Sequence, residues 1–147
     1  KMESIEPYDT VNEYSEVSVY VHRLLHTMSH QLMKSGSLLS GLEETSLAEF
    51  LFPEALTFAI YANQSQSYTA GGLYTLVDRD LDRWLKNAYR EGQYCIYDPV
   101  CSNQGGSCHA CTHIGEVGCQ YFNQNLSRAT LFGREAGTDD INGYWRE

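Results

Sequence analysis

The chain has 147 residues, of which 42% are hydrophobic and 20% are charged, and its formal net charge at pH 7 is -9. This length and composition are typical of one globular domain with its own core and exclude a disordered chain. The acidic balance disfavours a protein that binds nucleic acid without a partner, since phosphate contacts require a basic face. No apolar run approaches the roughly 18 residues of a membrane-spanning helix, and the polar N-terminus is unlike a signal peptide, so neither membrane insertion nor secretion is expected.

The first half of the chain mixes helical and extended patterns. Apolar residues recur at helical spacing across residues 18–34, which predicts a helix that ends at Gly36 and Gly41. Residues 43–53 favour a short helix that stops before its terminal proline. The continuous apolar run at residues 55–62 favours a strand buried on both faces.

The second half begins with a segment, residues 70–77, that fits either a strand or the start of a helix. Residues 78–92 predict an amphipathic helix with a mixed-charge, solvated face, because acidic residues alternate with its basic ones. A terminal helix is predicted over residues 119–133. We therefore expect an α+β fold in one compact domain, with a cysteine-rich segment between helices.

All five cysteines lie within 25 residues, which is the most distinctive feature of the sequence. An odd, clustered set is unlike a secreted disulfide scaffold, so it indicates a metal site in a reducing, cytoplasmic compartment. Cys108 and Cys111 form a CxxC pair, whose spacing lets two sulfurs reach one ion from a single turn. Gly105 and Gly106 would let the backbone curl around that ion.

A second pair of ligands is needed, and two arrangements are open. Cys101 belongs to both, and the fourth ligand is either Cys95 or Cys119, with the spacing of two pairs favouring Cys95. Four thiolates close the coordination shell of zinc, which is typical of a structural site, and no HxE motif is present to indicate a zinc deaminase. We therefore expect one structural Zn²⁺ and no enzymatic activity.

The first predicted helix carries a stripe of three histidines, at positions 22, 26 and 30. Such spacing places the rings on one helix face, where they could bind a metal. The simpler interpretation is that His22, His26 and His30 bond to neighbouring elements or face solvent. A metal-dependent hydrolase built on this stripe is retained as an alternative.

Seven segments, taken in chain order, carry a joint signature: LLHTMSHQLM (24–33), SGLEETSLAEFLF (40–52), ALTFAIYA (55–62), GGL (71–73), CIYDPVC (95–101), CHAC (108–111) and CQYFNQNLSRATL (119–131). Together they resemble the MrfA-type zinc-binding (MZB) domain family, and most of all its DrmB-like form from DISARM anti-phage defence. The resemblance covers residues 21–133, which leaves residues 1–20 as a polar lead-in and residues 134–147 as a C-terminal tail.

The resemblance implies a zinc-bearing domain that works beside a superfamily 2 helicase in DNA repair or defence. It also implies that the metal ligands come from the five cysteines as a pool: Cys95, Cys101, Cys108, Cys111 and Cys119. The sequence departs from the family where Ser127 stands in place of an aspartate.

These observations lead to one hypothesis and two alternatives. The hypothesis is a non-catalytic zinc module that docks onto a helicase or nuclease protein, with any DNA contacted through that partner. The first alternative is a zinc module that binds nucleic acid directly, and the second is the histidine-based hydrolase.

Overall fold

The computed structural model describes residues 15–63 and 67–145, so most of the predicted polar lead-in lies outside the described residues. The described part is a single α+β unit, as predicted. Its helices and strands are α1 (Glu16–Ser40), β1 (Leu47–Phe52), β2 (Thr57–Ala62), α2 (Ser67–Arg79), α3 (Leu81–Gly92), α4 (Val100–Asn103) and α5 (Ala129–Phe132). Short 3-10 turns lie at Glu44–Ser46, Pro53–Ala55 and Arg134–Ala136.

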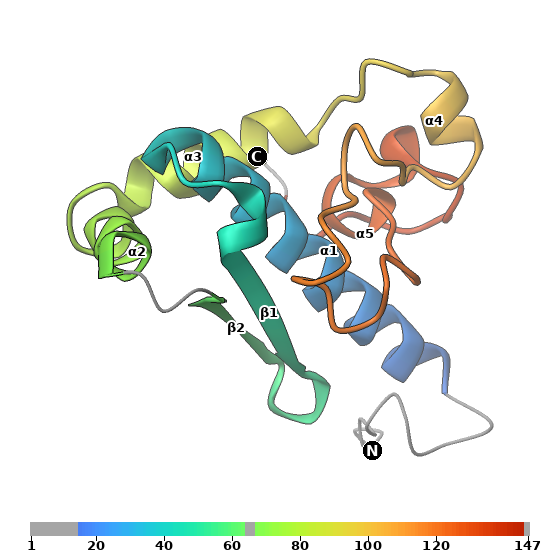
Figure 1. The fold of residues 1–147 in the computed structure, drawn as a ribbon. Coiled ribbons are helices and arrows are strands. Elements are labelled where there is room, and N and C mark those ends of the chain that lie inside the picture. The colour runs from blue at the N-terminus through green and yellow to red at the C-terminus, as the bar shows by residue number, and fades with distance from the viewer. Residues whose placement is uncertain (1–14, 64–66, 146–147) are drawn as a thin grey trace.

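Helix α1 runs through the middle of the molecule, between the β-hairpin and the loops that precede α5 (Figure 1). Ser15 caps its first turn by accepting a hydrogen bond from the backbone N–H of Ser18, and Gly41 ends it at φ +68°. The expectation that Gly36 ends this helix is wrong. Gly36 lies inside α1 because the indole ring of Trp84 packs against it, 3.2 Å from where a Cβ would stand.

The expectation of a short helix at residues 43–53 is wrong, since a 3-10 turn at Glu44–Ser46 leads directly into strand β1. It pairs antiparallel with β2 in a two-stranded sheet, from Leu47 opposite Ala62 to Phe52 opposite Thr57. Strand β2 is present as predicted, but its residues alternate between exposed and half-buried instead of being buried on both faces. A two-stranded sheet has only one covered face, so a continuous apolar run here does not indicate full burial.

The helix predicted over residues 78–92 is interrupted at Asp80, so α2 ends at Arg79 and α3 begins at Leu81. The two helices then turn so that both pack on α1 (Figure 1). A core cluster forms at this junction from Leu32, Leu76, Trp84 and Ala88. None of the helices in the described ranges is long and apolar enough to cross a membrane.

The terminal helix predicted over residues 119–133 is reduced to the four residues of α5. Left-handed backbone conformations at Phe122, Asn123 and Asn125 turn the chain instead. The segment after α5 is not loose within the described residues, since the backbone N–H groups of Tyr144 and Trp145 bond to carbonyls of residues 130 and 131. This end of the chain is therefore part of the packed fold.

Candidate metal centre

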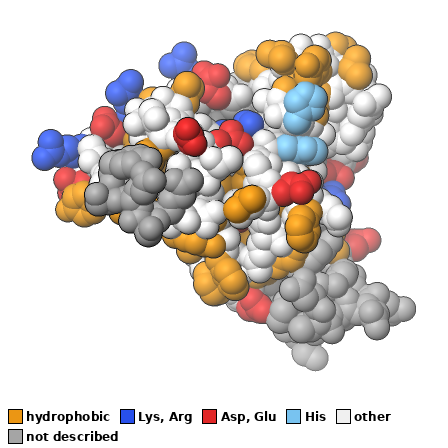
Figure 2. All heavy atoms as spheres, viewed as in Figure 1, with side chains coloured by type: hydrophobic (Ala, Val, Ile, Leu, Met, Phe, Trp, Pro, Cys, Tyr) orange, Lys and Arg blue, Asp and Glu red, His pale blue; other side chains and the backbone are white. Residues whose placement is uncertain are grey.

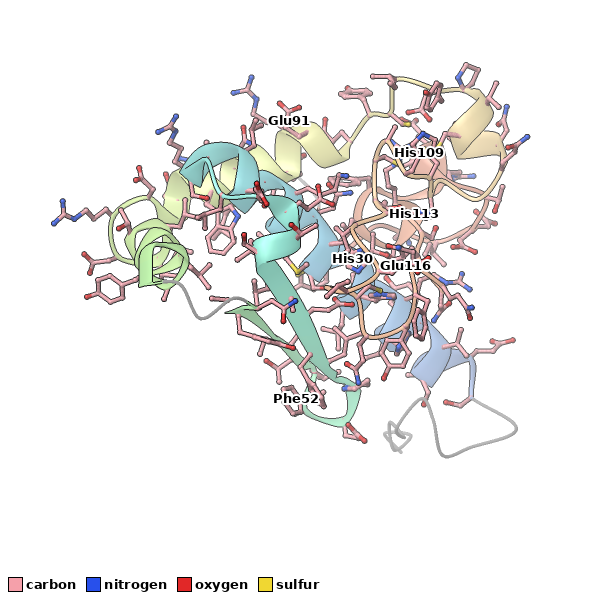
Figure 3. The ribbon with its side chains drawn as sticks, in the orientation of Figure 1. His30, Phe52, Glu91, His109, His113 and Glu116 are labelled. Carbon is pink, nitrogen blue, oxygen red and sulfur yellow. The ribbon has the colours of Figure 1, made fainter. Side chains whose placement is uncertain are left out.

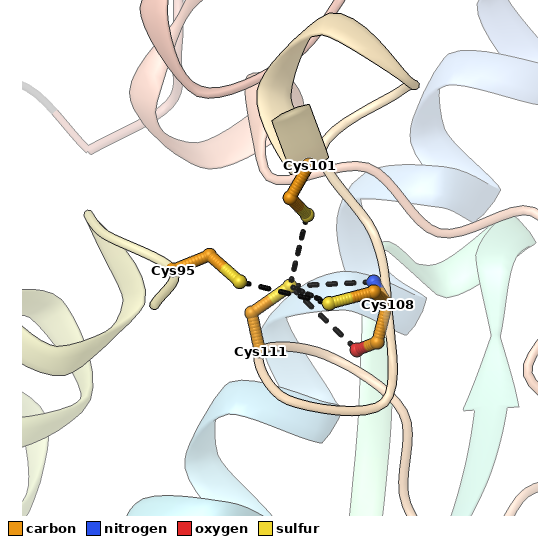
Figure 4. Close-up of side chains that lie close together, drawn as sticks. All are labelled: Cys95, Cys101, Cys108 and Cys111. Carbon is orange, nitrogen blue, oxygen red and sulfur yellow. Dashed lines mark hydrogen bonds between the residues drawn. The ribbon is translucent and has the colours of Figure 1, made fainter. Parts of the chain in front are cut away.

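Four cysteine sulfurs converge at one point in the segment between α3 and α5 (Figure 4). The Sγ–Sγ distances are 3.6 Å for Cys95–Cys108, 3.7 Å for Cys101–Cys111 and 3.7 Å for Cys108–Cys111. Four sulfurs at the usual Zn–S distance of about 2.3 Å would lie about 3.8 Å apart at the corners of a tetrahedron. A disulfide would need about 2.0 Å, and all five cysteines are free thiols. The four sulfurs could hold a metal ion, and their spacing is consistent with zinc.

The backbone around the four sulfurs follows from local turns. The N–H of Tyr97 donates to Cys95 Sγ, and the N–H of Cys108 donates to Cys111 Sγ. Such N–H bonds orient sulfur ligands and stabilise their negative charge. Gly105 and Gly106 both have positive φ, and at Gly106 the backbone also approaches the carbonyl oxygen of Ala136 so closely that a Cβ would clash with it.

Arg128 fastens this segment to the rest of the protein. Its side chain is fully buried and donates to the carbonyl oxygens of Gln93 and Gly106 and to Oδ1 of Asp98. Asp98 also accepts from the backbone N–H groups of Cys95 and Ser102. One buried guanidinium therefore joins the chain before, within and after the cysteine loop.

Charge at the four sulfurs is unevenly distributed. Burial and the neighbouring thiols raise the pKa of Cys101 and Cys111. Burial would also raise the pKa of Cys108, but backbone N–H groups at Ala110 and Cys111 outweigh it and lower that pKa to about 7. Cysteine binds a divalent ion as a thiolate, so ion binding would displace the protons that remain on these sulfurs. The Arg128 guanidinium interacts favourably with the resulting negative charge.

Three side chains of helix α1 form hydrogen bonds to three successive backbone carbonyls of the same segment. Gln31 Nε2 donates to the carbonyl of Cys111 at 3.0 Å, and Lys34 Nζ donates to that of His113 at 3.0 Å. His30 Nδ1 lies 2.8 Å from the carbonyl of Thr112, between them. Figure 3 shows His30 on α1 beside the loops that carry His113.

Cys119, the fifth cysteine of the predicted pool, lies apart from the other four. It is brought together with His26, His30 and Glu49, and the ligand atoms of these four residues all lie within 4.8 Å of one another. Glu49 comes from β1, so strand pairing places it there and no sequence motif marks it. Sequence reasoning missed this residue because it assigned residues 43–53 to a helix.

The second group is strongly coupled electrostatically. Burial would lower the pKa of His30, but interactions with Cys119 and Glu49 outweigh it and raise that pKa to about 9. Burial would raise the pKa of Cys119, but His26 and His30 lower it to about 6. The same two imidazoles hold the pKa of Glu49 well below its usual range, although burial acts in the opposite direction.

The third histidine of the stripe, His22, does not join this group. Asn125 Nδ2 lies 2.8 Å from its Nδ1, and the Tyr121 ring packs edge-on against it with centroids 4.5 Å apart. Burial lowers the pKa of His22 to about 4. All three histidines are at most 1% exposed, so a hydrolase site built on them would be closed to substrate.

Comparison with known proteins gives one distant relationship. The DISARM protein DrmB of Bacillus paralicheniformis is 28% identical over 124 residues, which cover 76% of this chain and 22% of that protein. The chain therefore spans about a fifth of the length of this relative. No protein-family model matches the sequence. The match supports a DrmB-like relationship, and the finer MZB assignment stays a prediction.

Proposed function

We propose that this chain is a non-catalytic, zinc-stabilised module of the MZB type that serves as a docking domain for a helicase or nuclease protein in anti-phage defence or DNA repair. The observation that carries the proposal is the set of four neighbouring cysteine sulfurs, with spacing consistent with zinc, from Cys95, Cys101, Cys108 and Cys111. The ligands share one short segment, so the ion orders that segment and fixes the surface around it. The similarity to DrmB, a protein of a defence system, supports the biological setting.

The surface that the ion would order is apolar. Four large side chains in residues 94–100 are between 49% and 83% exposed, namely Tyr94, Ile96, Tyr97 and Val100. Figure 2 shows apolar side chains gathered over the corner of the molecule that carries α4. Aromatic and aliphatic side chains grouped on a rigid surface are typical of sites where proteins bind one another.

The charge distribution favours a protein partner over direct binding to nucleic acid. The chain is acidic, and two of the basic side chains on α2 and α3 lie beside aspartates. Lys86 Nζ lies 2.7 Å from Asp82 Oδ2, and Arg79 Nε lies 3.7 Å from Asp78 Oδ2. Such paired charges release few counterions from DNA, so we expect any binding to DNA to depend weakly on salt.

The proposal is tested by binding to a purified candidate helicase or nuclease partner. Zinc-loaded protein is titrated against that partner by calorimetry, with Ile96→Asp in the exposed surface and Leu56→Asp on the hairpin as the matched control. We expect Ile96→Asp to weaken binding by at least about tenfold, because it places a charge in an apolar interface, and Leu56→Asp to leave it unchanged. A partner that binds both variants equally, or a steep salt dependence of binding to DNA alone, would contradict the docking role.

A further inference from the structure

The group formed by Cys119 with two histidines and a glutamate is the strongest chemical feature outside the four-cysteine centre. His26 and His30 lie one turn apart on α1, Glu49 lies on β1, and Cys119 lies in the loop before α5. All four are buried, the most exposed being Cys119 at 6%. Buried ionisable groups of this kind are rare unless they pair or bind a metal.

The four ligand atoms lie close together. His26 Nε2 lies 3.0 Å from Glu49 Oε1 and 3.2 Å from Cys119 Sγ, and His30 Nε2 lies 3.2 Å from Glu49 Oε1. In a tetrahedral zinc site with nitrogen, oxygen and sulfur ligands, these atoms would lie about 3.3–3.6 Å apart. Each of these three distances is within about 0.4 Å of the value in such a site, and all four ligand atoms lie within 4.8 Å of one another.

Hydrogen bonds alone do not satisfy this arrangement. The Nε2 atom of His26 carries at most one proton, yet it lies within bonding distance of two acceptors, Glu49 and Cys119. Its Nδ1 atom has no hydrogen-bond partner among the described residues. In a protonated cluster that unpaired N–H would belong to a buried cation, whereas in a metal complex it belongs to a neutral imidazole and costs less to bury.

The surrounding groups orient the ligands as metal sites require. The Thr112 carbonyl lies 2.8 Å from His30 Nδ1, which places the proton there and frees Nε2 as a ligand. Ser29 Oγ donates to Glu49 Oε2, which leaves Oε1 facing the histidines. The backbone N–H of Asn123 donates to Cys119 Sγ at 3.1 Å and stabilises a thiolate.

We propose that His26, His30, Glu49 and Cys119 form a second metal centre that binds Zn²⁺ or a similar divalent transition ion. Two anionic ligands and two neutral imidazoles balance the charge of such an ion, which makes its burial inexpensive. Four protein ligands with no exposed position indicate a structural site and not a catalytic one. The prediction of one zinc per chain thus becomes two ions per chain.

The two centres hold different parts of the fold. The four-cysteine centre closes a loop within residues 95–111, whereas the second centre ties α1 and β1 to the loop at Cys119. A link between distant residues removes more freedom from the unfolded chain, so the second centre should stabilise the whole domain. This inference is independent of the docking role, because it concerns metal content and not a partner.

Metal content of the full chain tests the proposal. Protein loaded with zinc and freed of excess ion is analysed by elemental mass spectrometry, as wild type and as the variants Glu49→Gln, Cys119→Ser and Cys95→Ser, with Glu44→Gln as the matched control. We expect two zinc ions in the wild type and in Glu44→Gln, and one in each of the other three. One zinc in the wild type would overturn the proposal, as would two zinc ions retained in folded Glu49→Gln and Cys119→Ser.

A measurement on the wild type alone covers the case in which these variants do not fold. Cobalt(II) is titrated into metal-free protein and followed by visible absorption. We expect two equivalents to enter tetrahedral sites, one with the intense charge-transfer bands of four thiolates and one with the weaker bands of a single thiolate. A second equivalent that gives only the faint spectrum of octahedral cobalt would overturn the second centre while leaving the first intact.

Discussion

Oδ1 of Asp98 lies 2.7 Å from Nη2 of Arg128, whose side chain is fully buried. The two residues are thirty positions apart in the chain. The aspartate belongs to the CIYDPVC segment and the arginine to the segment after the last cysteine, so two motifs that are far apart in sequence form one contact. Their contact connects the ordering of the cysteine loop to the packing of α5.

Replacing Arg128 with lysine should therefore destabilise the domain. A single ammonium cannot reach Asp98, Gln93 and Gly106 together, so at least one of these contacts is lost, and with it the fork that joins the three parts of the chain. We expect the free energy of unfolding to fall by about 2–4 kcal/mol, measured by urea denaturation of the zinc-loaded protein. Arg134→Lys, at an exposed arginine, is the control and should change it by less than about 0.5 kcal/mol. Equal effects of the two substitutions would show that Arg128 does not organise the loop.

Alanine at Gly106 should be worse than alanine at Gly105. Both glycines have positive φ, so each substitution costs about 1–2 kcal/mol in backbone strain. Only at Gly106 does the new Cβ meet the Ala136 carbonyl oxygen, at 2.0 Å, whereas Gly105 has open space. We expect Gly106→Ala to cost about 1–3 kcal/mol more than Gly105→Ala, measured by thermal and urea unfolding. Identical losses would mean that residues 105–106 do not approach residue 136 closely.

Trp84 joins α3 to α1 both by packing and by a hydrogen bond from its Nε1 to the Leu32 carbonyl at 2.8 Å. Trp84→Phe removes that bond and leaves part of the core unfilled, so the free energy of unfolding should fall by about 2–3 kcal/mol. Far-UV circular dichroism during urea denaturation measures it. Tyr74→Phe, at an exposed aromatic residue on α2, should have little effect. A stable Trp84→Phe variant would argue against α3 packing at this position.

Loss of the four-cysteine centre should loosen one segment and spare the rest. In Cys101→Ser, residues 95–111 lose the ion that orders them, while the Leu32, Leu76, Trp84 and Ala88 cluster has no part in that site. Hydrogen exchange read by mass spectrometry should accelerate at least tenfold in residues 95–111 and remain slow where α1 meets α3. Ser102→Ala, at the next residue, serves as the control and should exchange like the wild type. Uniform acceleration across the chain would mean that this centre holds the whole fold.

The sequence could reveal those features that depend on residues close together along the chain. Apolar spacing predicted α1, because burial of one helix face imposes a period on its residues. A continuous apolar run predicted β2 but not its one-sided exposure, and the mixture of helical and extended patterns predicted an α+β domain. The CxxC turn predicted a metal site, although its ligand set stays a prediction, because two sulfurs three residues apart can reach one ion without help from the rest of the chain.

Tertiary structure decided what depends on partners distant in the chain. Strand β1 forms because β2 pairs with it, and Gly36 stays inside α1 because Trp84 covers it. Cys119 lies with His26, His30 and Glu49 only after α1, β1 and the loop before α5 have packed together. No spacing along the chain encodes that meeting, because its members come from three separate elements whose approach depends on the burial of all of them at once.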